Sequence, residues 1–231
     1  RLSRLPGQGI PVYTNGSVFI AGNSNNPPIY NARIHQLLQM SLNIYEATRT
    51  GNHPLLRCYS GTNDLAKWAA MLHETIKIAW GAVPLFWYSQ LDGRSTRPLE
   101  VSIAENVDAM AFYASKGIPV EVNESHHWSL RDAPDAVAVA AAFLAAHNAK
   151  KAGVRTYVAQ YMFNNPRGTS PANDLAKMYA KIELIEAFQD ASFRTYREAR
   201  TGLNSLPLDM DLANVPPGDS AVALAKAIKA A

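Results

Sequence analysis

Polar and aromatic residues that could do chemistry gather in four stretches, each of which directly follows an apolar run typical of a buried strand. In chain order the stretches hold Arg57, Tyr59, Ser60 and Asn63; Tyr88, Gln90, Asp92 and Arg94; Asn123, Glu124, His126, His127 and Trp128; and Gln160, Tyr161, Asn164, Asn165 and Arg167. The stretches that precede the strands, such as Lys116-Gly117, are short and plain. Ligands of α/β proteins bind at the carboxyl ends of parallel strands, so we expect the site on these four loops.

Glu124 and His126 suit general acid/base chemistry, and His126 could equally hydrogen-bond a substrate, bind a metal or have a structural role. Neighbouring residues of a strand point to opposite faces, so at most one of His126 and His127 faces a given site. Arg57 could bind a substrate carboxylate through two parallel hydrogen bonds, or form an ion pair with an acidic residue of a loop. Tyr88 ends the third apolar run and joins Arg57, Glu124 and His126 as a candidate catalytic residue, although packing in the core or rim is the commoner role.

Five apolar runs, beginning near residues 18, 55, 83, 118 and 157, alternate with stretches of helical periodicity at about 29–48, 65–80, 98–117, 134–151 and 171–188. Starts that are roughly 30 to 40 residues apart match one strand–helix unit each, and strands connected in this way pair in parallel. The run 83–88 is apolar on both faces, as a buried parallel strand should be. A last short helix is predicted at 220–230.

Two α/β folds fit this pattern, an open doubly wound sheet and a (β/α)8 barrel. A complete barrel takes about 250 residues, and the chain has 231 with five clear units. We therefore predict one domain over residues 1–231 with a partial (β/α) barrel, or TIM-barrel, type of fold and a parallel sheet. The first residue is Arg1 rather than methionine, which raises the alternative of a fragment of a larger chain.

Composition excludes several classes of protein. Hydrophobic residues make up 48% and charged residues 18% of the chain, which is typical of a globular protein and not of a disordered one. No apolar run approaches the roughly 18 residues of a membrane span. The single cysteine, Cys58, rules out an internal disulfide and suits a reducing compartment, so we expect a cytoplasmic protein.

The basic residues do not form a stripe for nucleic acid. The net charge is only +3, and lysines and arginines are scattered among acids. The densest basic cluster, Arg194, Arg197 and Arg200 around Glu198, is interpreted as the solvated face of a helix.

Three common site motifs are absent from the sequence. No Gly-x-Gly-x-x-Gly follows a strand, no Gly-Lys-Ser/Thr is present to bind phosphate, and no Gly-x-Ser-x-Gly elbow occurs. The common dinucleotide, nucleoside triphosphate and α/β-hydrolase sites are thereby excluded, and no metal site is predicted in the leading interpretation.

The second half of the chain resembles the last units of the barrel in the catalytic subunit of methylaspartate (glutamate) mutase and related adenosylcobalamin-dependent mutases. The likeness lies in the strand 118–122 followed by His126-His127-Trp128, the small-residue helix ending Lys150-Lys151-Ala152-Gly153-Val154, and the loop Asn165-Pro166-Arg167-Gly168-Thr169. This resemblance implies an isomerase with a (β/α)8 barrel whose mouth encloses the adenosyl side of the cofactor. The reaction would be a radical rearrangement of a small carboxylate or amino acid, with Arg57 on a substrate carboxylate.

The sequence departs from this family at two places. The lysine and glutamate that contact the cofactor's ribose in the mutases are missing from residues 160–165, so contacts with adenosylcobalamin would come from Gln160, Tyr161, Asn164 and Asn165. The Asp-x-His-x-x-Gly motif that ligates cobalt is also missing, which implies a separate cobalamin-binding domain or subunit as a partner.

Two further functions stay open at this point. One is a metal-assisted barrel lyase or hydrolase that uses Glu124 and His126 as acid and base. The other is a non-catalytic assembly domain that kept the barrel-derived fold and lost the site.

Overall fold

The computed structural model describes residues 12–14, 17–21, 39, 41–49, 53, 55–59, 64–93, 95–123, 128–129, 131–163 and 169–201. The predicted helix at 220–230 and most of the one at 29–48 lie outside these residues. So do nine residues of the four candidate loops, which are Ser60, Asn63, Arg94, Glu124, His126, His127, Asn164, Asn165 and Arg167.

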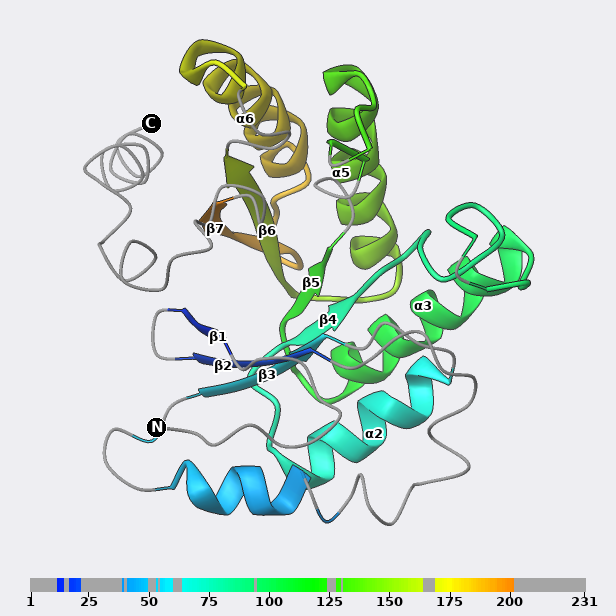
Figure 1. Ribbon diagram of the computed structural model, residues 1–231, viewed down its shortest axis with the longest axis vertical. Coiled ribbons are helices and arrows are strands. Elements are labelled where there is room, and N and C mark those ends of the chain that lie inside the picture. The colour runs from blue at the N-terminus through cyan, green and yellow to red at the C-terminus, as the bar shows by residue number, and fades with distance from the viewer. Residues whose placement is uncertain are drawn as a thin grey trace.

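Seven strands form one sheet in the order of the sequence, β1-β2-β3-β4-β5-β6-β7 (Figure 1). Their bounds are β1 Val12–Thr14, β2 Ser17–Ala21, β3 Leu55–Tyr59, β4 Gly81–Val83, β5 Val120–Val122, β6 Thr156–Phe163 and β7 Arg194–Thr201. Strands β1 and β2 pair antiparallel, and every later pair of neighbours is parallel. The α/β class and the parallel sheet predicted from the sequence are confirmed.

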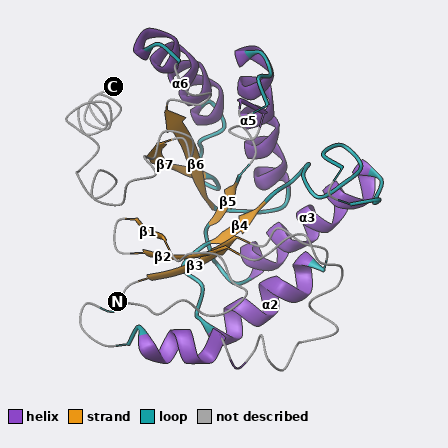
Figure 2. Ribbon diagram, in the orientation of Figure 1, coloured by secondary structure: helices purple, strands orange, loops and turns teal. Residues whose placement is uncertain are grey.

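Residues 41–47, between β2 and β3, are helical, and four further helices connect the parallel strands from β3 to β7 and lie along the same side of the sheet (Figure 2). They are α2 Leu65–Thr75, α3 Leu99–Ser115, α5 Asp135–Lys151 and α6 Pro171–Glu186. Crossovers between parallel strands are right-handed, so a sheet whose strands follow the order of the sequence places its helices on one face. The described strands do not show the reversal of strand order that defines a doubly wound sheet.

Proline, serine and glycine set the ends of these helices as the sequence predicts. The Ser170 side chain caps α6 by accepting a hydrogen bond from the Asn173 amide at 3.2 Å, and Pro171 occupies the first turn. Gly117 and Gly153 follow α3 and α5 with φ angles of 68° and 86°, a left-handed conformation that glycine adopts without steric cost.

Two details of the predicted strands are wrong. The run at 83–88 contributes only its first residue to β4, because Leu85 and Tyr88 adopt φ angles of 51° and 63° that take the chain out of the sheet. Residues 194–201, where we expected a solvated helix face, form β7. Their side chains alternate between the two faces of the sheet, so the apparent helical spacing of the arginines is incidental.

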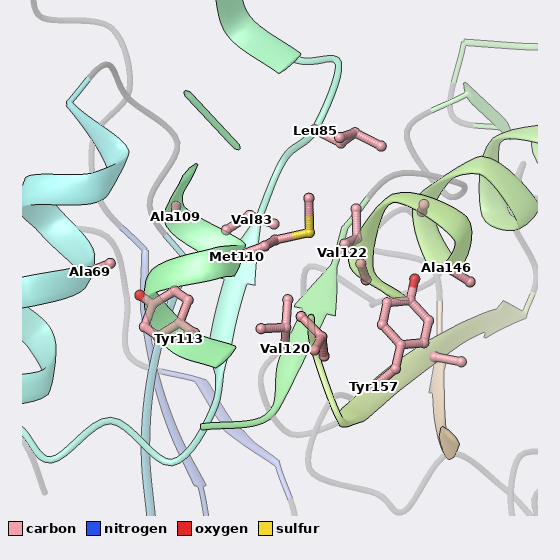
Figure 3. Close-up of a cluster of buried hydrophobic side chains, with 14 of the residues drawn as sticks. Ala69, Val83, Leu85, Ala109, Met110, Tyr113, Val120, Val122, Ala146 and Tyr157 are labelled. Carbon is pink, nitrogen blue, oxygen red and sulfur yellow. The ribbon is translucent and has the colours of Figure 1, made fainter. Parts of the chain in front are cut away.

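The hydrophobic core fills the space between the sheet and the helices (Figure 3). From the sheet it receives Val83, Val120, Val122 and Tyr157, and from the helices residues such as Met110. Val120 and Val122 both face the helices, so the residue between them, Glu121, points to the other face of the sheet. In the described part of the chain, no helix has the length and apolar character needed to cross a membrane.

Candidate functional site

A row of polar side chains crosses the face of the sheet that carries no described helix. Arg57 lies between the core residues Leu56 and Cys58 of β3, and Gln160 lies between the core residues Ala159 and Tyr161 of β6. Alternation along each strand therefore directs Arg57 and Gln160, like Glu121, away from the helices. Glu198 of β7 pairs in register with Gln160. We call the five side chains Arg57, Trp80, Glu121, Gln160 and Glu198 the polar row.

Glu121 is the centre of the polar row. Its Oε1 accepts hydrogen bonds from Arg57 Nη2 and from Gln160 Nε2, and its Oε2 accepts one from the indole nitrogen of Trp80 at 2.7 Å. Gln160 Nε2 also donates to Glu198 Oε2 at 3.1 Å. One carboxylate thus fixes donors that come from three separate segments of the chain, and the row continues to β7.

The polar row is shielded from water at its centre. Arg57 is 2% exposed, Glu121 0% and Gln160 5%. A buried charge is tolerated when it is paired and hydrogen-bonded, and the Arg57–Glu121 ion pair meets both conditions. The Arg57 guanidinium carbon also lies 5.7 Å from the centre of the Trp80 ring, within cation–π range. The result is a rigid site whose charged groups lie in surroundings of low polarity, where electrostatic interactions are strong.

The structure brings two predicted site residues together, Arg57 and Gln160. It places a third, Tyr161, on the opposite face of β6 from Gln160, and the predicted contact of Tyr161 with a cofactor stays a prediction. Tyr161 is fully buried in the core on the helix side, because it is the next residue along β6 and side chains alternate. Burial, together with the nearby Glu186 carboxylate, raises the pKa of the Tyr161 hydroxyl.

Tyr88 lies at the carboxyl end of β4 in the loop that leads to α3 (loop 84–98), whose described residues, 84–93 and 95–98, are tightly held. Its amide donates to Asp92 Oδ2 at 3.2 Å and its carbonyl accepts from Arg97 Nη2 at 3.0 Å. Leu85 is fixed by Asn106, whose Oδ1 accepts from the Leu85 amide at 2.9 Å. Non-glycine residues with positive φ, such as Leu85 and Tyr88, cost energy and cluster at functional sites. Loop 84–98 is therefore preorganised at the end of the sheet where a site is expected.

An aromatic contact joins the loops that follow β4 and β5. The Trp87 and Trp128 ring centres are 5.1 Å apart, and the Arg131 guanidinium lies 4.3 Å from the centre of the Trp87 ring. Two of the four predicted loops therefore meet in space. The Trp128 ring thus packs against Trp87 of the neighbouring loop.

Sequence reasoning missed Trp80, Glu121 and Glu198. A signal existed for Glu121, since it is the single acid in the apolar run 118–122 and a strand buried on both faces must pair such a charge. Glu198 was hidden by the incorrect helix interpretation of residues 194–201. Trp80 immediately precedes β4 and carries no distinguishing pattern.

The described residues include no group of three or more histidine, cysteine, aspartate or glutamate side chains that could hold a metal ion. Glu124 and His126, on which the metal-assisted alternative depends, lie outside them, so that alternative stays a prediction. Comparisons with family models, with curated proteins and with solved structures each find nothing that matches this chain.

Proposed function

We propose that the chain is the partial-barrel catalytic domain of an isomerase that binds a small carboxylate or amino acid in the polar row. The observation that carries this proposal is a buried Arg57–Glu121 ion pair on the helix-free face of a sheet whose strands follow the order of the sequence. Consecutive units of a (β/α)8 barrel have this strand order, and their helix-free face is the barrel interior. The polar row would then line that interior.

Arg57 would bind the substrate carboxylate. A guanidinium has five N–H donors arranged to match carboxylates, and it holds its charge at any physiological pH. Glu121 orients this guanidinium from one side, and Trp80 stacks near it. Because the side chain is already fixed and desolvated, little conformational entropy is lost when a carboxylate binds.

Adenosylcobalamin is the cofactor that the resemblance to the mutases suggests, and when bound it would supply the radical chemistry. Of its four predicted contacts, Asn164 and Asn165 lie outside the described residues and Tyr161 faces the core. Gln160 faces the polar row, but its amide nitrogen is used by Glu121 and Glu198. The described residues therefore do not form the predicted contact set, and the cofactor enters the proposal through a cobalamin-binding partner subunit. This chain's own part is to bind, orient and shield the substrate.

The cofactor is tested by titrating the purified chain with adenosylcobalamin, alone and with a cobalamin-binding protein encoded beside it. Visible absorbance and gel filtration report binding. We expect binding that depends on the partner. Absence of binding under both conditions would remove cobalamin from the proposal and make metal analysis of the purified chain the next measurement.

The carboxylate site is tested by calorimetric titration with propionate, succinate and glutarate. Arg57→Lys keeps the positive charge that Glu121 needs but loses the paired donors, so carboxylate affinity should fall about tenfold. The control is Arg197→Lys, since Arg197 also pairs with a glutamate, Glu186, but on the helix side of the sheet and with side chains that are 25% and 26% exposed. Unchanged affinity in a folded Arg57→Lys variant would contradict the role of Arg57.

A further inference from the structure

Two hydrogen-bond acceptors at the β7 end of the polar row could take a further donor, and one of them is buried and unsatisfied. Gln160 is only 5% exposed, and its buried Oε1 has no hydrogen-bond partner in the described part of the chain. A buried acceptor without a partner costs free energy and calls for an explanation, such as a ligand that donates to it. On the same amide, Nε2 is directed to Glu121 and Glu198, which leaves Oε1 for a donor from elsewhere.

Glu198 is the second acceptor, and it brings a negative charge. Its hydrogen bond from Gln160 involves a neutral amide, and none of the ion pairs among the described side chains includes Glu198. The adjacent Arg197 does not pair with Glu198, because Arg197 points to the helix side and pairs with Glu186.

The charges of the described polar row do not balance. Arg57 and Glu121 neutralise each other, and Glu198 adds one uncompensated carboxylate. In surroundings of low polarity an uncompensated charge favours an opposite charge in the ligand. A ligand that complements the described side chains would therefore be a cation that also donates hydrogen bonds.

The β7 end of the row is the end that solvent reaches. Glu198 is half-buried, and Tyr196, two residues away on the same face of β7, is 58% exposed. Arg57 and Glu121, by contrast, are closed off from water. A ligand can thus present a cationic group at Glu198 while its carboxylate reaches inward to Arg57.

We propose that Gln160 Oε1 and the Glu198 carboxylate form a subsite for a protonated amine, so that the ligand of the polar row is an amino acid and not a plain carboxylate. This inference rests on the proposed function, because it assumes that Arg57 holds the carboxylate of the same molecule. A primary ammonium has three donors, enough for both acceptors. Hydrogen bonds between charged groups are about twice as strong as neutral ones, so this subsite decides specificity.

The test compares ligands that differ only in the amine. Calorimetric titration of the purified chain at pH 7.5 uses three pairs: alanine with propionate, aspartate with succinate, and glutamate with glutarate. We expect at least one amino acid to bind about tenfold more tightly than its partner without the amine. Glu198→Gln should bring that ratio close to one.

Glu198→Gln is suited to this test because the glutamine oxygen can still accept the hydrogen bond from Gln160. Circular dichroism melting verifies that the variant is folded. The matched control is Glu183→Gln, which removes a carboxylate on the exposed side of α6 and should keep the full preference for the amino acid.

The possible results separate the two proposals. Equal binding of both members of every pair, or a preference that survives Glu198→Gln, would overturn the ammonium subsite and leave the carboxylate site of Arg57 standing. If no carboxylate of the three pairs binds to the unmodified chain, the proposed function fails and the ammonium subsite fails with it.

Discussion

The Arg57 guanidinium and the Glu121 carboxylate form an ion pair whose side chains are only 3% and 0% exposed. The pair joins two strands that are not neighbours, since β4 lies between β3 and β5. It therefore bridges the middle of the sheet, and Trp80 and Gln160 depend on the same carboxylate. A substitution on either side of this pair should affect folding before it affects binding.

Glu121→Gln should lower the free energy of unfolding by about 3–5 kcal/mol, because it leaves the Arg57 charge buried without an opposite charge. The double variant Arg57→Gln/Glu121→Gln removes both charges and should lose less than the sum of the two single variants. Urea unfolding of the four proteins gives the coupling as a double-mutant cycle. Additive losses would show that the ion pair has no energetic role.

Gly81 and Tyr113 approach each other so closely that no side chain fits between them. A Cβ added at Gly81 would lie 2.2 Å from Tyr113 Cε2 and 2.3 Å from Cδ2. Tyr113 is buried in the core, so its ring cannot move away easily. Gly81→Ala should therefore lower the free energy of unfolding at the upper end of about 1–3 kcal/mol, the usual range for overpacking.

The control for Gly81→Ala is Gly117→Ala, which adds a methyl group where nothing lies within 4 Å but φ is +68°. That variant carries only the backbone cost of a left-handed residue, about 1 kcal/mol. Thermal unfolding of both variants compares the two losses of unfolding free energy. A smaller loss for Gly81→Ala than for Gly117→Ala would mean that the sheet and α3 separate at little cost.

The sequence predicts β2 to β6 and all four connecting helices because each signal is local. An apolar run marks a strand, and a proline, serine or glycine marks the end of a helix, as Ser170 and Gly153 do. The sequence does not predict β7, since its charged residues contradict the apolar pattern of a buried strand. That strand is stabilised by register with β6 over all eight of its residues, which is a tertiary property.

The polar row is predictable only in part for the same reason. Arg57 and Gln160 were identified because they lie near the carboxyl ends of apolar runs. Their partner Glu121 carries a local signal as the single acid of its apolar run, whereas Glu198 becomes recognisable only through strand register, which aligns it with Gln160. The sequence places Tyr161 correctly along the chain. It does not show to which face the Tyr161 side chain points, because that depends on which residues of β6 face the helices.

Asn106 holds loop 84–98 by bonding to both backbone groups of Leu85. Its Oδ1 accepts from the Leu85 amide at 2.9 Å and its Nδ2 donates to the Leu85 carbonyl at 3.3 Å. Asn106→Ala leaves these buried groups without partners and should lower the free energy of unfolding by about 2 kcal/mol or more. Limited proteolysis should then cut within the loop.

Asn148→Ala is the matched control for Asn106→Ala. The Asn148 side chain also donates to a backbone carbonyl, that of Leu144 at 2.8 Å, but this hydrogen bond is exposed on α5. Its loss should change the free energy of unfolding by less than about 0.5 kcal/mol. Equal effects of the two substitutions, with no new cleavage in loop 84–98, would show that Asn106 does not organise the loop.

Lys181 of α6 carries its amine into the contact between α5 and α6, where it is 1% exposed. The pKa of this amine is lowered from 10.5 to about 7, mainly by burial and also by the positive charge of Lys177, while Asp135 and Asp174 act in the opposite direction. In the unfolded chain the pKa returns to the ordinary value. Between about pH 7 and 10 the unfolded chain therefore binds more protons than the folded one.

The free energy of unfolding should accordingly rise with pH across this window, because folding no longer buries a charged amine once the pH exceeds about 7. Lys181→Met keeps the volume and removes the titration. It should raise the free energy of unfolding by about 2 kcal/mol or more at pH 6, and by much less near pH 10. Urea unfolding of both proteins at pH 6, 8 and 10 measures the difference, in which all other titrating groups cancel. Lys67→Met, at a side chain that is 52% exposed, is the control for replacing a lysine that is not buried. A constant difference for Lys181→Met would mean that the amine stays charged in the folded protein, held by Asp135 and Asp174.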